Sequence, residues 1–93
     1  MTREKIEDYI SITAPDYPVV LADNLDEAFV GVDTENEPPR AVYSIEKCID
    51  ILKDGMSYDE AAEYFWYNVA GAGGEGYPIY ISTPMAEEDS PYE

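Results

Sequence analysis

The chain has 93 residues, of which 21 are acidic and 5 are basic, so its formal net charge at pH 7 is −16. This length provides one modest hydrophobic core and is too short for two. The charge argues against direct binding to nucleic acid or to anionic membranes, because both require clustered Lys and Arg. It favours solubility and partners that are basic.

Hydrophobic residues still make up 45% of the chain and aromatic residues 13%, whereas acidic disordered chains lack aromatics. A folded domain is therefore expected. The single cysteine, Cys48, cannot form an internal disulfide and suits a reducing cytoplasm. We find no apolar run long enough to span a bilayer and no signal-peptide pattern, so we expect a cytoplasmic protein.

The first predicted element is a helix over residues 2–12. Thr2 is its expected N-cap, and Ile6 and Tyr9 share its apolar face. Pro15 ends the helix, since proline disfavours helical geometry in the residue before it.

Two strands are predicted in the next part of the chain. Residues 29–33 (FVGVD) alternate in polarity, residues 34–39 form a polar loop closed by two prolines, and residues 40–43 (RAVY) give the return strand of a hairpin. Before them, the apolar run 18–23 is equally compatible with a short strand and with a buried loop.

A second helix is predicted over residues 45–54. Ser44 is its expected N-cap and Gly55 its C′ residue. Its buried stripe is expected to contain Ile45, Cys48, Ile49 and Leu52, with Glu46, Asp50 and Asp54 outside.

The strongest helix signal covers residues 57–70 (SYDEAAEYFWYNVA). Ser57 and Glu60 have the spacing of a capping box. Four consecutive aromatics, residues 64–67, surround the helix, so at least Tyr67 must contact water or a partner. The short connection requires this helix and the preceding one to pack as a hairpin. The expected buried stripe consists of Tyr58, Ala61, Ala62, Phe65 and Val69.

The glycine-rich run 71–76 (GAGGEG) resembles a phosphate loop only superficially. It follows a helix, lacks the Lys-Ser/Thr ending and carries Glu75, so we interpret it as a flexible connector. Residues 77–82 predict a last strand, with Pro78 indicating an edge or a first position.

These elements predict an α+β domain: three helices packed on a small, mostly antiparallel sheet of three strands. We expect residues 1–81 to form this single domain and residues 82–93 to form an acidic C-terminal tail. The tail holds four acidic residues and no basic one, so the domain itself carries −12.

Catalysis and metal binding have little support in the sequence. The chain has no histidine, the commonest general base and metal ligand. Cys48 lies on an apolar stripe, as a buried hydrophobe does, and no spacing selects a catalytic pair of carboxylates. The oxygen-rich segment 33–37 lacks the central glycine and the distant glutamate of an EF-hand loop, and Asp23, Asn24, Asp26 and Glu27 form a second cluster. Weak, opportunistic binding of calcium or magnesium is the alternative to a solvated loop. We predict a protein that is not an enzyme and that needs no cofactor or metal.

The carboxylates of the second and third helices carry the main functional prediction. If the two helices pack side by side, their outer faces form a negative ridge that could compete with a nucleic acid for a basic groove. A purely solvated acidic surface and adaptation to high salt are the alternatives. Tyrosines beside the ridge favour a binding role, because exposed tyrosines often anchor interfaces. The predicted partner-binding residues are Glu46, Asp50, Asp54, Asp59, Glu60, Glu63, Tyr64 and Tyr67.

Four segments also carry a resemblance: AFVGV (28–32), RAVYSIEKCIDIL (40–52), GMSYDEAAEYFWYNVAGA (55–72) and PIYI (78–81). Together they resemble a type of small acidic protein encoded by bacteriophages, to which no activity is assigned. The stretch 73–77 departs from that pattern. The resemblance implies the cytoplasm of an infected host and a role in host takeover or counter-defence.

The leading prediction is therefore a phage-type accessory or inhibitor protein that binds a basic host protein through an acidic helical face and mimics a polyanion such as DNA. The alternative is a structural, oligomer-forming protein that uses exposed aromatics such as Trp66 and Tyr67. A carboxylate enzyme would instead need a pocket that gathers at least two carboxylates with raised pKa values.

Overall fold

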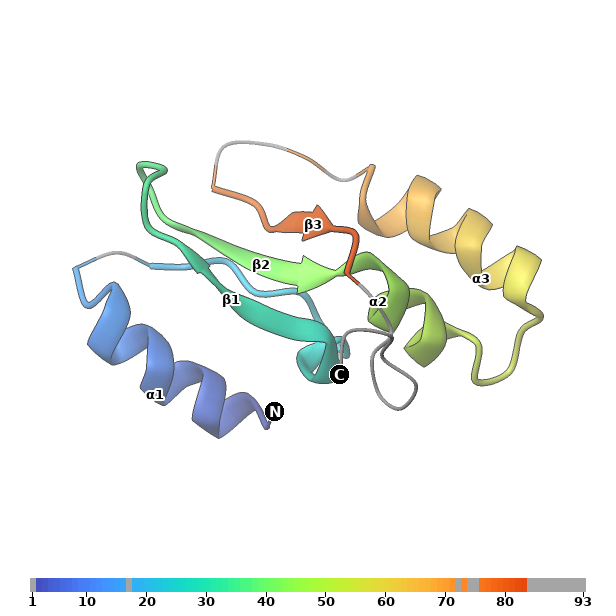
Figure 1. Ribbon diagram of the computed structural model, residues 1–93, viewed down its shortest axis with the longest axis horizontal. Coiled ribbons are helices and arrows are strands. Elements are labelled where there is room, and N and C mark those ends of the chain that lie inside the picture. Colours follow the sequence, from blue (N-terminus) through green and yellow to red (C-terminus); the bar gives the residue numbers. More distant parts are fainter. Residues whose placement is uncertain (1, 17, 72, 74–75, 84–93) are drawn as a thin grey trace, which may run out of the picture.

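The computed structural model describes residues 2–16, 18–71, 73 and 76–83. It has the predicted α+β fold, with three helices and a three-stranded sheet (Figure 1). In chain order the elements are α1 (Arg3–Thr13), the 3-10 turn η1 (Asp26–Ala28), β1 (Phe29–Asp33), β2 (Arg40–Ser44), α2 (Ile45–Leu52), α3 (Tyr58–Tyr64), the π-helical turn η2 (Phe65–Val69) and β3 (Ile79–Ile81).

The strand order is β1-β2-β3, so β2 is central. β1 and β2 form the predicted antiparallel hairpin, and a bulge after Phe29 leaves Val30 without a partner in the register. β3 pairs with β2 in parallel. The parallel pairing arises because α2 and α3 carry the chain away from the end of β2 and back to its start. The sheet is thus mixed, and β3 is an edge strand that begins directly after Pro78, as the proline indicated.

All three predicted N-caps are present. The side chains of Thr2 and Ser44 each accept a hydrogen bond, at 3.2 Å, from the backbone N–H three residues further on. At α3 the capping box is complete: Glu60 N–H donates to Ser57 Oγ at 3.2 Å, and Ser57 N–H donates to Glu60 Oε1 at 3.1 Å. These caps satisfy amides that a helix leaves unpaired in its first turn, and they fix where each helix begins.

The core lies between the sheet and the hairpin formed by α2 and α3, which lie side by side (Figure 1). A row of six aromatic rings, each in contact with the next, crosses the molecule from α1 to η2. Neighbouring ring centroids are 5.0 to 6.0 Å apart. We call this set the aromatic row; in spatial order it comprises Tyr9, Phe29, Tyr43, Tyr80, Phe65 and Trp66.

The apolar run 18–23 is not a strand. It is an irregular segment that packs against the core, and Ala22 N–H donates to the hydroxyl of buried Tyr43 at 2.9 Å. This bond gives the buried Tyr43 hydroxyl a partner and fastens the segment at Ala22.

The ends of both hairpin helices differ from the prediction. α2 stops at Leu52 instead of residue 54, because residues 53–55 form a turn in which Gly55 has φ of +100°. The third helix passes into the π-helical turn after Tyr64, where Ala70 N–H donates to Phe65 O at 2.8 Å. Tyr58, predicted in the buried stripe, is 60% exposed because it occupies the first position of α3, at the margin of the core.

Candidate functional site: an acidic and aromatic face on helix α3

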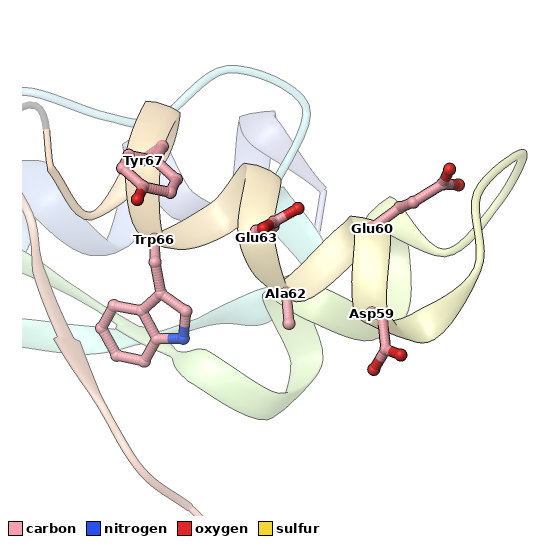
Figure 2. A pocket seen from close by; sticks show the side chains of 6 residues that line it. All are labelled: Asp59, Glu60, Ala62, Glu63, Trp66 and Tyr67. Atoms are coloured by element: carbon pink, nitrogen blue, oxygen red, sulfur yellow. The ribbon is translucent and has the colours of Figure 1, made fainter.

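One side of α3 and of the η2 turn that continues it combines carboxylates with exposed aromatic rings around an open hollow of about 530 Å³ (Figure 2). Asp59 and Trp66 project to the same side of the helix, and the small side chain of Ala62 lies between them. Trp66 is 54% exposed and Tyr67 is 78% exposed. The hollow is lined by Asp59, Glu60, Ala62, Glu63, Trp66 and Tyr67.

A second open hollow, of about 460 Å³, adjoins the first. Glu60, Glu63 and Tyr67 line both hollows. The second is lined by Met56, Glu60, Glu63, Tyr64, Tyr67 and Asn68. The hollows therefore belong to one continuous surface. We call it the α3 face and define it by Asp59, Glu60, Glu63, Tyr64, Trp66 and Tyr67.

Among the residues that the structure describes, none forms an ion pair with the carboxylates of the α3 face. All five basic residues lie in the described ranges, and there they form ion pairs elsewhere or none. Arg3 pairs with Asp26 at 3.0 Å, and Lys53 pairs with Asp50 at 3.6 Å. Across residues 2–16, 18–71, 73 and 76–83, no basic side chain lies within ion-pair distance of the three carboxylates of the α3 face.

The three carboxylates of the α3 face differ in whether they form hydrogen bonds that support the fold. Glu60 uses one oxygen to accept the hydrogen bond of the capping box, so part of its side chain serves the fold. Asp59 and Glu63 are exposed. These two carboxylates are consequently the ones most available to a partner.

The α2 carboxylates do not join this surface. Glu46, predicted to face outward, is half-buried and holds the chain after β3. Its Oε2 accepts from Ser82 Oγ at 2.6 Å and its Oε1 accepts from Thr83 N–H at 2.7 Å. Burial alone would raise the pKa of Glu46, but these hydrogen bonds outweigh it and the pKa is lowered. Glu46, predicted on the outer face, thus uses both carboxylate oxygens to hold the segment after β3.

The other two carboxylates predicted on the second helix, Asp50 and Asp54, are exposed. Asp50 is partly neutralised by Lys53, one turn further along the chain, and such surface pairs contribute little stability. Asp54 lies in the turn after α2. Among the residues that the structure describes, the lining of both α3 hollows includes neither of them, nor Glu46. The structure therefore gathers five of the eight predicted residues on one face: Asp59, Glu60, Glu63, Tyr64 and Tyr67.

Trp66 completes the face and is missing from the predicted site. Its ring meets the ring of buried Phe65 edge to face, with centroids 5.0 Å apart and an interplanar angle of 79°. The contact holds an exposed indole against the core. The unbroken run of four aromatics was the available signal, because a helix with one buried side cannot hide them all.

A third cavity, of about 440 Å³, lies where the irregular segment 20–25 meets the end of the third helix and the start of β3. Tyr64 and Asn68 line both this cavity and the second hollow. Burial is the main cause that raises the pKa of Tyr80, at the cavity wall, to about 12, so its hydroxyl stays protonated at neutral pH.

The remaining candidate groups serve the fold. Burial raises the pKa of the Cys48 thiol to about 12, as expected for a buried hydrophobe and not for a nucleophile. In the oxygen-rich loop 33–37, the two Asp33 oxygens accept from Glu35 N–H at 3.0 Å and from the Asn36 side chain at 2.7 Å. Within the described ranges, no three potential ligands gather in a way that could hold a metal ion.

Comparison of the chain with protein-family models, with curated proteins and with solved structures found no match. In the part of the chain that the structure describes, every helix is too short or too polar to cross a membrane.

Proposed function

We propose that this protein binds a basic surface of another protein through the α3 face, as an accessory or inhibitor protein of the kind that bacteriophages encode. In this role the face takes the place of a polyanion such as DNA. The observation that carries the proposal is the coincidence, on α3 and the adjoining η2, of exposed aromatic rings and of carboxylates that have no ion-pair partner among the described residues.

The carboxylates and the exposed aromatic rings contribute to binding in different ways. Carboxylates steer a basic partner toward the face and fix its register, but add little affinity where they remain hydrated. Exposed aromatic rings supply the contact area that turns an encounter into a complex, and Trp and Tyr are the residues that most often dominate interface energetics. The net charge of −16 extends the steering over the whole molecule.

The experiment begins with capture of a basic protein from bacterial lysate on the immobilised chain, followed by purification of that protein and measurement of its affinity. We expect the affinity to fall steeply with salt, and heparin or duplex DNA to compete for the same partner surface. A partner that binds the chain and duplex DNA simultaneously would contradict the mimicry.

Charge-neutralising variants locate the binding face. Asp59→Asn combined with Glu63→Gln should weaken the complex about tenfold or more at low salt. The matched control is Glu4→Gln combined with Glu7→Gln, which removes the same charge from exposed positions of α1. Equal losses in the two double variants would mean that only the total charge matters, and would overturn the assignment to the α3 face.

Self-association is a second candidate, favoured by the exposure of Tyr67 and Trp66 on the same helix. It requires assembly that depends on protein concentration, resists salt and disappears in Tyr67→Ala and Trp66→Ala. Analytical ultracentrifugation at two salt concentrations distinguishes this candidate from binding of a basic partner.

A further inference from the structure

We propose that the hollow between Asp59 and Trp66 receives an arginine side chain of the partner, with its guanidinium against the indole. The inference depends on the proposed function and specifies which cation the α3 face selects. It concerns the first hollow only, in which an aromatic ring and carboxylates lie around the same open space (Figure 2).

The spacing along the helix places the three kinds of surface next to one another. Glu63 precedes Trp66 by about one turn and Asp59 precedes it by about two, so both carboxylates lie along the helix from the indole. Ala62, between Asp59 and Trp66, contributes only a methyl group and leaves the space open. A side chain that enters there meets an apolar floor, a ring on one side and carboxylate oxygens on the other.

The indole is already held in place before a partner arrives. Phe65 is fully buried, and its edge-to-face contact with Trp66 at 5.0 Å restricts the indole, while 54% of the Trp66 surface remains exposed. A restricted ring loses less conformational entropy on binding than a free one. It also presents the π system that attracts cations.

An arginine matches this hollow better than a lysine does. Guanidinium is planar, weakly hydrated and able to stack on an aromatic ring while its N–H groups donate to a carboxylate. The ammonium of lysine is a compact and strongly hydrated charge, which would have to give up water to approach the indole. No arginine or lysine of the described chain lines the hollow.

The single tryptophan of the chain gives a direct readout, since indole fluorescence can arise only from Trp66. The probes are capped octa-arginine and octa-lysine peptides, titrated separately at the same low ionic strength. We expect octa-arginine to change the Trp66 emission and to bind about fivefold to tenfold more tightly than octa-lysine. Affinities are measured in parallel by calorimetry, which does not depend on the fluorophore.

Two variants distinguish the effect of the Trp66 indole from the effect of any exposed aromatic ring. Trp66→Leu should lower the affinity for octa-arginine to that for octa-lysine. Tyr58→Leu is the matched control, because Tyr58 is 60% exposed at the start of α3 and does not line the hollow. It should leave the preference for arginine intact, and circular dichroism establishes that both variants are folded.

The possible failures can be told apart. If both peptides bind through the α3 face with equal affinity, or if Trp66→Leu keeps the preference, the arginine inference is wrong while the proposed function stands. If neither peptide binds, or if neutralising Asp59 and Glu63 has no more effect than the α1 control, both proposals are overturned.

Discussion

Trp66 and Phe65 are consecutive residues with opposite environments: the first is 54% exposed, the second is fully buried, and their rings meet edge to face at 5.0 Å. A surface that we assign to binding is thereby attached directly to the core. The contribution of Phe65 to stability and the proposed contribution of Trp66 to binding can be separated experimentally. A change to the buried ring should mainly alter stability, and a change to the exposed ring should mainly alter binding.

Replacement of the buried ring by Phe65→Ala should lower the free energy of unfolding by about 3–5 kcal/mol, since it removes packing against both Trp66 and Tyr80 and leaves a cavity. Urea unfolding followed by circular dichroism measures the loss. Tyr67→Ala is the control: Tyr67 is 78% exposed, so its loss should change stability by no more than about 0.5 kcal/mol. A similar cost for the two variants would contradict the described packing.

The capping box allows charge and folding to be separated at Glu60. Ser57→Ala should cost about 1 kcal/mol, because the N–H of Glu60 loses its acceptor. Glu60→Gln should lower the free energy of unfolding much less. Glutamine keeps an oxygen that accepts the hydrogen bond from Ser57 N–H, and it also occurs at this position of capping boxes. If Glu60→Gln is as destabilising as Ser57→Ala, the charge itself supports the helix.

Gly71 is required where the third helix ends. A Cβ at this position would lie 2.9 Å from the carbonyl oxygen of Tyr67 and 3.0 Å from that of Trp66, and both are backbone atoms that cannot move independently. Gly71→Ala should therefore destabilise the fold by about 1–3 kcal/mol. Gly73→Ala provides the control, because a Cβ there would have no atom within 4 Å. Thermal unfolding of the two variants should give a lower Tm for Gly71→Ala alone.

Glu46 should make stability depend on pH. Its pKa in the folded protein is lowered below the ordinary value of 4.5 by the hydrogen bonds from Ser82 and Thr83, which outweigh the effect of burial. The resulting stabilisation is fully present above pH 4.5 and disappears as the pH falls through the lowered pKa. In Glu46→Gln this part of the pH dependence should vanish. The test is urea unfolding of both proteins at pH 7 and at intervals down to about pH 3. Parallel curves over that range would contradict the assignment.

Features encoded within a few residues were predictable from the sequence. The caps at Thr2, Ser44 and Ser57 each depend on a hydrogen bond to a residue three positions away. The hairpin strands were also recognisable, because the polarity of β1 alternates and a proline-closed loop separates it from β2. The exposure of Tyr67 followed from the impossibility of burying four consecutive aromatics on one helix.

Features that depend on distant contacts were not predictable. The sequence around Glu46 gave no indication that its carboxylate binds Thr83, which is 37 positions away. Two other features depend in the same way on segments that are far apart in the sequence. They are the parallel pairing of β3 with β2 and the hydrogen bond from Ala22 to Tyr43. The structure accordingly brings together the predicted residues that are close in sequence, in α3 and the adjoining η2, whereas the carboxylate of Glu46 is engaged by Ser82 and Thr83 instead.

The aromatic row also makes the molecule its own optical probe. Tyr43 and Tyr80 have ring centroids 5.7 Å apart, and Phe65 alone separates Tyr80 from the indole. At such separations, excitation absorbed by the tyrosines passes by resonance transfer to Trp66, the lowest-energy acceptor. Unfolding would therefore appear as a loss of the extra indole emission that is seen when tyrosine and tryptophan are excited together, relative to excitation at longer wavelengths where only the indole absorbs. Excitation of the indole alone would report occupancy of the surface, and neither measurement needs an added label.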